Sequence, residues 1–506
     1  MTDVVEVTPK PPQKIGQEKC TRVANSGVLT IENLSSRPRD LGRYASLKIK
    51  MMRSFLLSLV AAFLASAPHA GDAADGIFDI PPGFTAEATT QKLREALADA
   101  SIARIRFQDG QQYKLLPFKI DRPVLLEGRA EIVPADLTQP LIEVTAPDVA
   151  IKQLTFLGRD KQSDKSSFRR FLRVRKHSHR FRLSECTFRN FACRYQTTQF
   201  YCVEVELNDV LDWVITDCRF EDMQNEVDGV AYKKALADYK AWKDAGRPQP
   251  EKMLPRKPGF VGAIRVSHSG QYFGEKSSSG RITQCVFKNI YSSRRSGQSV
   301  DQFPGDWYDG DAIRIYVDRK VPAAHSNQSV DKEVAVAIHS CKFIDIQKSA
   351  VKAGEIGRTT ISNCRVFNKR SDYPMMAGFR ANITRGLRIT SCEVHGRAER
   401  GVYIGSGGSA FIRGLVFLPY ETLPDGSEEK CGIAGVELGR GSYRADRIAI
   451  SGLYVSHADS AVNCVNCSNV SIDSVTLIEG GPVVALGSRA DKKSIRLPKQ
   501  AQSLLP

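Results

Sequence analysis

The hexapeptide IHSCKF, Ile338–Phe343, decides the fold, because its pattern of apolar and small residues recurs along most of the chain. The template Ile-x-x-Cys-x-Phe, with conservative replacements, identifies ten segments in all. The residues at the cysteine position are, in order, Leu154, Cys186, Cys218, Cys285, Cys341, Cys364, Cys392, Leu415, Leu453 and Val475. A recurring strand of this kind predicts a solenoid, in which successive coils stack upon one another.

The spacing of these segments indicates the length of one coil. Cys341, Cys364 and Cys392 follow one another at intervals of 23 and 28 residues, and the longer intervals elsewhere contain insertions. Where cysteine is absent, leucine or valine takes its place, so the thiol behaves as a small hydrophobic group. We therefore predict an interior ladder of buried thiols, although the chain's 12 cysteines would also be compatible with a disulfide framework.

A second short strand precedes most of the cysteine segments. Its versions read FLRVR, CVEVE, AIRVS, AIRIY, AVKAG, GFRAN, GVYIG, GVELG and AVNCV. Two strands per coil, with turns between them, predict parallel sheets wound into an all-β solenoid over residues 75–490. Ahead of them, TTQKLREALADA (Thr89–Ala100) is typical of a helix and is placed to cap the amino-terminal end. A helical insertion at 229–260 interrupts the repeat, either as decoration or beside a groove.

These features together resemble a known superfamily. The capping helix, the strand VLLEG and the stacked ITQCVF-type strands are similar to those of the right-handed parallel β-helices of the pectin-lyase-like superfamily. The resemblance implies a right-handed parallel β-helix with an N-terminal capping helix. It does not specify an activity, because lyases, hydrolases, epimerases and phage adhesins are built on that scaffold.

The bulk composition and the amino-terminal region bear on location and partners. The formal net charge of +16 favours anionic partners. Residues 51–70 combine Arg53, an apolar run and a small-residue exit, which predicts a signal peptide and a secreted or periplasmic protein. Residues 1–50 are then an upstream extension, and 491–506 a C-terminal tail. Export disfavours nucleic acid as a partner, and no later segment is apolar enough to predict a membrane span.

The outward position of the preceding strand carries most of the functional signal. Side chains alternate faces along a strand, so the third residue of AIRVS and its relatives points away from the core. Down successive coils this position holds Arg173, Glu204, Arg265, Arg314, Lys352, Arg380, Tyr403, Glu437 and Asn463. Four consecutive cations repel one another at strand spacing, and an acidic polysaccharide along the column would offset that repulsion. The alternative is a solvated face whose long side chains splay into water.

The column contains groups suited to β-elimination from a uronic acid. That reaction needs a base for the proton next to the carboxylate, a cation to neutralise the carboxylate and an acid for the leaving oxygen. We predict Lys352, Arg380 and Tyr403 as the catalytic residues. The predicted substrate-binding residues are Arg265, Arg314, Asp309, Asp311, His395 and Glu437.

The lysine and arginine on adjacent coils are similar to those of the alginate lyase and chondroitinase B group. That resemblance implies Lys352 as the base and Arg380 as its partner. The group also holds calcium with glutamates and an asparagine beside the base, whereas here the preceding coil offers Arg314. We therefore predict no metal and no cofactor, with calcium left open because its expected ligands are not found. We also predict a monomer.

Three other functions remain open at this stage. Uronate epimerisation uses the same proton abstraction as the lyase reaction. A non-catalytic glycan-binding surface protein would use the column for binding alone. A polygalacturonase-like hydrolase is a third alternative, because Asp309 and Asp311 offer paired carboxylates. The sequence does not identify the polysaccharide.

Overall fold

The computed structural model describes most of the predicted solenoid. The described residues are 76–136, 139–158, 170–193, 199–206, 209–225, 229–247, 250, 260–268, 278–291, 310–317, 334–354, 358–369, 375–384, 386–422, 428–430 and 432–497. They all belong to one compact unit, Ala74–Pro506. The predicted extension (1–50) and signal peptide (51–70) lie outside the described residues.

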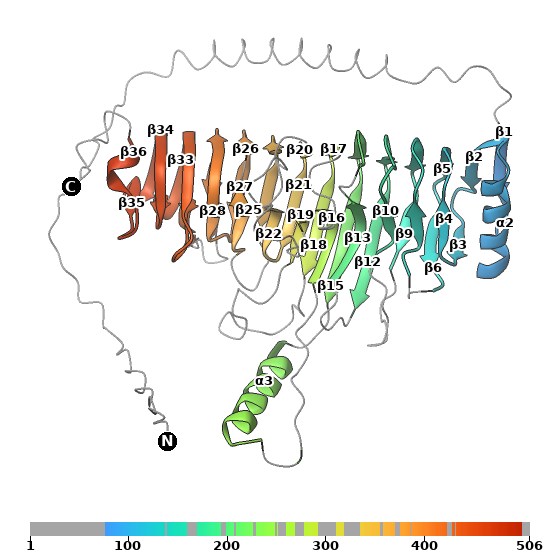
Figure 1. The fold of residues 1–506 in the computed structure, drawn as a ribbon, viewed down its shortest axis with the longest axis horizontal. Helices are drawn as coiled ribbons and strands as arrows, with labels where there is room; N and C mark the ends of the chain where they lie inside the picture. Colours follow the sequence, from blue (N-terminus) through green and yellow to red (C-terminus); the bar gives the residue numbers. More distant parts are fainter. Residues whose placement is uncertain are drawn as a thin grey trace, which may run out of the picture. The chain divides into compact units, whose positions relative to one another are not determined.

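One coil consists of three strands that turn through successive corners. For example, β16 (Phe260–His268), β17 (Ser278–Thr283) and β18 (Val286–Tyr291) follow one another along the chain. Each pairs in parallel with the strand three further on, namely β19 (Asp311–Val317), β20 (Val334–His339) and β21 (Lys342–Ile346). The described strands join 34 members into one parallel sheet, which Figure 1 shows as a stack of neighbouring strands. The fold is the right-handed parallel β-helix, as predicted.

The stacked strands form three faces. The column face comprises β4 (Phe118–Ile120), β7 (Ile142–Val144), β10 (Leu172–Val174), β13 (Gln199–Glu206), β16, β19, β22 (Ser349–Ala353), β25 (Ala377–Thr384), the first half of β28 (Arg400–Arg413), β32 (Gly432–Leu438), the end of β33 (Ala445–Cys464) and β35 (Val484–Leu486). The second face comprises β1 (Gly76–Ile80), β2 (Ile102–Phe107), β5 (Val124–Glu127), β8 (Val149–Lys152), β11 (Arg182–Ser184), β14 (Trp213–Thr216), β17, β20, β23 (Arg358–Ser362), β26 (Leu387–Thr390), the second half of β28, the start of β33, the start of β34 (Cys467–Gly480) and β36 (Ile495–Arg496). The third face comprises β3 (Gln112–Leu115), β6 (Glu131–Pro134), β9 (Thr155–Leu157), β12 (Thr187–Cys193), β15 (Arg219–Asn225), β18, β21, β24 (Arg365–Asn368), β27 (Glu393–Gly396), β29 (Val416–Leu418), the middle of β33 and the end of β34. A separate antiparallel pair joins β30 (Tyr420–Thr422) to β31 (Glu428–Lys430).

The number of strands per coil corrects the sequence prediction of two. The Ile-x-x-Cys-x-Phe segment is not one strand, because a corner divides it between the second and third faces. In the coil of Cys285, β17 ends at Thr283 and β18 begins at Val286. Gln284, the residue before the cysteine, has a φ of 56°, and this left-handed conformation turns the chain. The pattern of apolar residues alone does not reveal such a corner, because the apolar residues on both sides of it still point inward.

The interior is built from ladders of like residues on adjacent coils. Phe156, Phe188, Phe220, Phe287 and Phe343 stack with ring centroids 4.7, 5.0, 5.1 and 4.8 Å apart in succession. The cysteines of the repeat are free and buried, so the predicted thiol ladder is confirmed. The thiols of Cys218 and Cys285 lie 3.7 and 3.8 Å from carbonyl oxygens of the coil before.

Two helices accompany the strands. The amino-terminal helix α2 (Ala86–Ala98) has Thr85 as its N-cap, and the Thr85 side chain accepts a hydrogen bond from the Ala88 N–H. It buries Leu93 and Leu97 and packs on the first strands, which confirms the predicted cap (Figure 1). The insertion between β15 and β16 contains α3 (Gly229–Asp244), also as predicted. None of the described helices is long and apolar enough to cross a membrane.

The last coil extends beyond the predicted boundary at residue 490. A short 3-10 helix, η4 (Lys492–Ser494), leads into β36. This strand pairs with β34 through Ile495 and Arg496, and Ile495 is buried. The repeat therefore continues into the segment that the sequence analysis assigned to the tail.

Candidate functional site

The outward residues of the column face stack in the predicted register. Each pairs with the next in a parallel ladder, in the order Lys119, Glu143, Arg173, Glu204, Arg265, Arg314, Lys352, Arg380, Tyr403, Glu437 and Asn463. Adjacent strands lie about 4.8 Å apart, so this column brings together side chains from eleven widely spaced parts of the chain. The four consecutive cations of the sequence prediction, Arg265 to Arg380, occupy its centre.

The centre of the column is less open than its sequence suggested. Lys352 is only 7% exposed, and its Nζ lies 4.0 Å from Oδ2 of Asp311, which is 1% exposed. Arg314 and Arg380, on the coils to either side of Lys352, are half-buried. The alternative of a solvated face, with long side chains that splay into water, therefore does not apply to Lys352. Burial of its ammonium group is tolerable because the Asp311 carboxylate compensates the charge.

Asp311 is the most unusual group in the column face. Neither of its carboxylate oxygens accepts a hydrogen bond from a described residue, although both are buried. Its neighbour in register, Ser349, likewise has a buried hydroxyl with no hydrogen-bond partner among the described residues. Buried polar groups are nearly always satisfied in folded proteins, so unsatisfied ones often mark a functional site. Asp311, Ser349 and Lys352 form such a cluster.

On the amino-terminal side of the four cations, an acidic residue of the column forms ion pairs with arginines. Glu204 is 5% exposed and forms ion pairs with Arg170, with Arg173 at 3.6 Å and with Arg265 at 3.3 Å. Arg265 also lies over the ring of Tyr201, with 5.9 Å from its guanidinium carbon to the ring centroid. The predicted substrate residue Arg265 therefore belongs to an internal network.

On the carboxyl-terminal side, Tyr403 and Glu437 share one arginine. Arg400 Nε lies 3.0 Å from Glu437 Oε1, and the guanidinium carbon lies 5.6 Å from the Tyr403 ring centroid. Asn463 donates a hydrogen bond of 3.3 Å to Glu437. Burial raises the pKa of the Tyr403 phenol, and the positive charges of Arg440 and Arg380 only partly oppose this. The phenol is therefore protonated at neutral pH.

Two of these partners, Arg170 and Arg400, were missed from the sequence, whereas Asp311 was predicted as a substrate-binding residue. Arg170, Asp311 and Arg400 each lie three residues before a column residue, namely Arg173, Arg314 and Tyr403. They form a second set of positions alongside the column. A search for polar residues at this fixed offset would have found them, but Asp311 alone was proposed.

Two predicted residues are not part of this group. Asp309 lies outside the described residues, so its separation from Asp311 is not defined. His395 lies on β27 of the third face, paired with Phe367 and Leu418 rather than with column residues. Its Nε2 is 3.2 Å from Glu393 Oε2, and its ring stacks on Phe367 at 5.2 Å.

Among the described residues, one cluster has the composition of a metal site. His177, His179 and Asp209 lie at the turns that follow β10 and β13. They are separate from the Lys352 cluster, which is formed by β19 and β22.

The fold places the chain among the right-handed parallel β-helix proteins, the class whose resemblance was predicted from the repeat. Among solved structures, the chain is similar to the Dettilon tailspike protein, with a TM-score of 0.47, 9% identity, and coverage of 83% of this chain and 68% of the other. It is also similar to a polygalacturonase from Erwinia carotovora ssp. carotovora, with a TM-score of 0.41, 9% identity, and coverage of 85% and 100%. A PL6 family polysaccharide lyase from Pseudopedobacter saltans gives a TM-score of 0.37, 10% identity, and coverage of 85% and 94%.

At such low identity these similarities concern the fold alone. No protein-family model matches the chain, and no curated protein matches its sequence. Function must therefore be argued from the site itself.

Proposed function

We propose that this protein is an exported enzyme that acts on an acidic polysaccharide by β-elimination. The single observation that carries the proposal is the stacking of Arg314, Lys352, Arg380 and Tyr403 on four successive coils. A linear polymer with a carboxylate on each sugar would meet this series of groups along its length. Export rests on the signal-like segment at 51–70.

Each group has a role in the elimination. Arg314 or Arg380 binds the uronate carboxylate and stabilises the negative charge that develops when the adjacent C–H bond breaks. Lys352, as the neutral amine, takes that proton. The electron pair forms the new C=C bond, the glycosidic C–O bond breaks, and Tyr403 donates its proton to the leaving oxygen. Re-delivery of a proton to the opposite face, without C–O cleavage, would give epimerisation instead.

The surroundings of Lys352 act in two directions. The neighbouring arginines favour its neutral form, which is the form able to accept a proton. The Asp311 carboxylate stabilises the ammonium group that exists after transfer. Both carboxylate oxygens of Asp311 are buried, so Asp311 acts on the reaction through Lys352 rather than by contact with the sugar.

A second candidate, a non-catalytic glycan-binding protein, is favoured by the same 4.0 Å approach of Asp311 to Lys352. If Asp311 keeps the amine protonated, Lys352 binds anionic sugars but takes no proton. The polygalacturonase-like hydrolase remains a weaker alternative, which would need Asp311 and Asp309 as a carboxylate pair.

Ultraviolet absorbance from unsaturated sugar ends tests the proposal. The full-length protein is incubated with alginate, polygalacturonate or chondroitin sulfate, and one of them should give rising absorbance. Lys352→Ala should lower the rate by about 10²- to 10⁴-fold, the usual contribution of a general base. Lys352→Arg should be equally inactive, because arginine keeps its proton.

The matched control is Lys288→Ala, which removes an exposed lysine from β18 on the third face and should leave the rate unchanged. Binding of an acidic polysaccharide without new absorbance, retained by Lys352→Arg, would contradict the lyase and support the binding protein. New reducing ends without absorbance would point to the hydrolase. An exchange of the uronate proton with solvent, without cleavage, would indicate the epimerase.

A further inference from the structure

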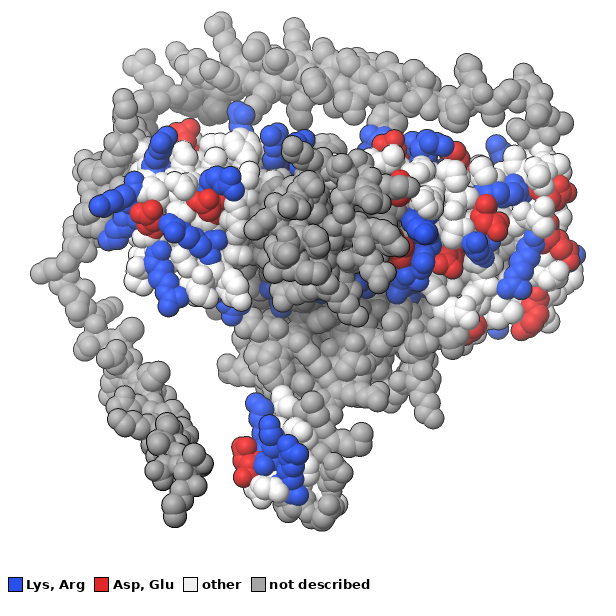
Figure 2. Space-filling view, viewed as in Figure 1, with Lys and Arg blue, Asp and Glu red and all other residues white. Residues whose placement is uncertain are grey.

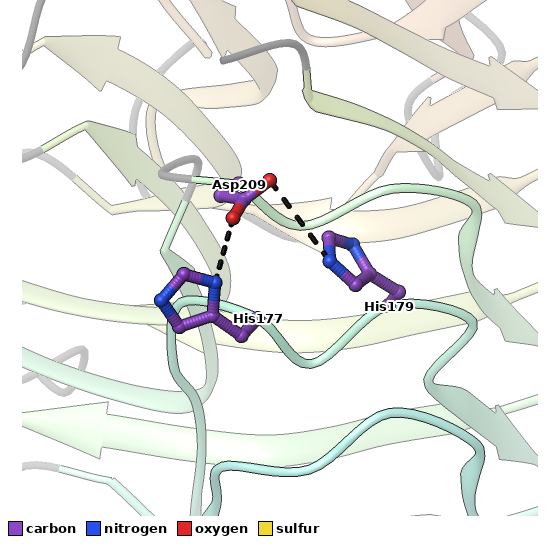
Figure 3. Close-up of side chains that lie close together, drawn as sticks. All are labelled: His177, His179 and Asp209. Carbon is purple, nitrogen blue, oxygen red and sulfur yellow. Dashed lines mark hydrogen bonds and ion pairs between the residues drawn. The ribbon is translucent and has the colours of Figure 1, made fainter. Parts of the chain in front are cut away.

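Two histidines and an aspartate converge at the rim of two adjacent coils. His177 and His179 lie on the turn after β10, and Asp209 lies on the equivalent turn after β13 (Figure 3). His177 Nδ1 is 2.6 Å from Asp209 Oδ2, and His179 Nε2 is 3.9 Å from Asp209 Oδ1. Both imidazole rings therefore face one carboxylate, from the coil below it.

The backbone holds this arrangement in place. Ser178, between the two histidines, is fully buried and donates a 3.0 Å hydrogen bond to the Val144 carbonyl. The inward turn of Ser178 leaves both histidine side chains on the outside. The His177 N–H also donates to the Asp209 carbonyl at 2.9 Å, which ties the two turns together. His177 has a φ of 68°, in the left-handed region that non-glycine residues seldom occupy.

We propose that His177, His179 and Asp209 bind one divalent transition-metal ion of the zinc type. Two imidazoles and a carboxylate suit zinc, cobalt and nickel, whereas magnesium and calcium prefer oxygen ligands. The three ligand atoms all lie within 4.8 Å of one another. With Zn–N bonds of about 2.0–2.1 Å, tetrahedral ligands are about 3.3 Å apart, between the two separations in the cluster. Water completes the coordination, since His177 is 51% exposed at its side chain.

The hydrogen bonds of the cluster set the strength of binding. The His177 Nδ1 proton that faces Asp209 must move to the other ring nitrogen, which is open to water. His179 Nδ1 accepts a 3.2 Å hydrogen bond from the Leu211 N–H, so binding through Nε2 requires that bond to break. Loss of one ordinary hydrogen bond lowers affinity by roughly tenfold.

A metal ion here would cross-link two adjacent coils. Its ligands come from turns that follow β10 and β13, the strands that carry Arg173 and Glu204 of the column. The ion would hold the Glu204 end of the column face in register. This inference does not depend on the proposed lyase activity, because its residues do not touch Lys352, Arg380 or Tyr403.

Titration of the tag-free, full-length protein with Co²⁺ and Zn²⁺ tests the site. Co²⁺ absorption should saturate at one ion per chain, and Zn²⁺ should displace it, whereas Ca²⁺ should not. Asp209→Asn, which keeps the shape of the side chain, should weaken binding by more than the roughly 10- to 100-fold typical of an outer-sphere partner. His177→Asn should do the same, and asparagine tolerates the positive φ. Zn²⁺ should raise the melting temperature of the wild-type protein only.

His339→Asn is the matched control, since His339 is exposed on another coil and hydrogen-bonds to Ser362. It should bind Co²⁺ like the wild type. Absence of binding at millimolar metal, or equal binding by Asp209→Asn and His177→Asn, would overturn the site. If one variant misfolds, the other still gives the result, and neither outcome bears on the absorbance assay for lyase activity.

Discussion

At the scale of single residues, the residue before the cysteine position of each Ile-x-x-Cys-x-Phe segment turns the chain from one face to the next. All ten of these residues have φ between 52° and 65°: Gln153, Glu185, Asp217, Gln284, Ser340, Asn363, Ser391, Gly414, Gly452 and Ser474. They are polar or glycine and none is β-branched, which is what a left-handed conformation requires. Their composition is thus a sequence signal for the corner that the strand pattern did not reveal.

Asn363 is suited to a test of this requirement, because its side chain is exposed and its N–H donates to the Thr390 carbonyl. Asn363→Val should lower the free energy of unfolding by about 1–2 kcal/mol, since an L-residue with a branched side chain resists positive φ. Asn363→Gly should stay within about 1 kcal/mol of wild type. Urea denaturation measures both, and equal stability of the two variants would contradict the role assigned to the corner.

The column residues show that the side of a strand on which a residue lies does not determine how far that residue is buried. Alternation along β22 correctly predicted that Lys352 lies on the outer side of the strand, in register with Arg314 and Arg380. It did not predict that Lys352 would be 7% exposed, or that Asp311 would lie beside it. Which face a residue occupies follows from strand geometry, but what covers that face depends on the packing of the other coils.

At the scale of elements, the third face owes much of its stability to continuous stacking. Phe220 on β15 is fully buried between Phe188 and Phe287, with interplanar angles of 4° on both sides. Identical aromatic rings can stack at strand spacing because parallel, in-register strands place equivalent residues directly above one another. A column of like residues therefore indicates parallel register.

Replacement of Phe220 by alanine should destabilise the protein by about 3–5 kcal/mol, the usual cost of a large aromatic cavity in a core. Phe411→Ala is the control, because Phe411 on β28 is 36% exposed and should cost clearly less. Chemical denaturation followed by circular dichroism compares the two. A Phe220→Ala loss no greater than that of Phe411→Ala would show that the stack contributes little.

At the scale of the whole molecule, acidic residues compensate the excess positive charge in some regions and leave it uncompensated in others. Figure 2 shows basic and acidic side chains interspersed over the described parts of one face. Along the column, Glu204 and Glu437 balance the arginines at either side. The rungs of Arg314, Lys352 and Arg380 lie between these two acidic residues, with Asp311 beside Lys352. A polyanion should therefore be attracted to the centre of the column rather than to basic residues in general.

Two variants that each remove one positive charge test whether a polyanion is attracted by the centre of the column or by the net charge of the protein. Each is made in the Lys352→Arg background so that substrate is not consumed. Arg380→Ala should weaken binding of the preferred acidic polysaccharide by about tenfold or more, as expected for a charge-assisted hydrogen bond. Arg447→Ala removes an equal charge from a side chain that is 72% exposed, and should change affinity less than about twofold. Calorimetry at low and high salt makes the comparison, and equal losses would mean that only net charge matters.

The sequence by itself determined the repeat, the parallel register, the capping helix, the buried thiols and the order of residues along the column. These properties depend on local alternation and on a period of about one coil, both of which are visible in a linear chain. Only the tertiary structure decided that each coil has three strands, that Lys352 is buried against Asp311, that His395 lies on another face, and that His177 and His179 meet Asp209. His177 and Asp209 are 32 residues apart, the same interval as Cys186 and Cys218, but the sequence does not show which turn residues point toward one another. Corners, burial and contacts between side chains exist only once the coils have stacked.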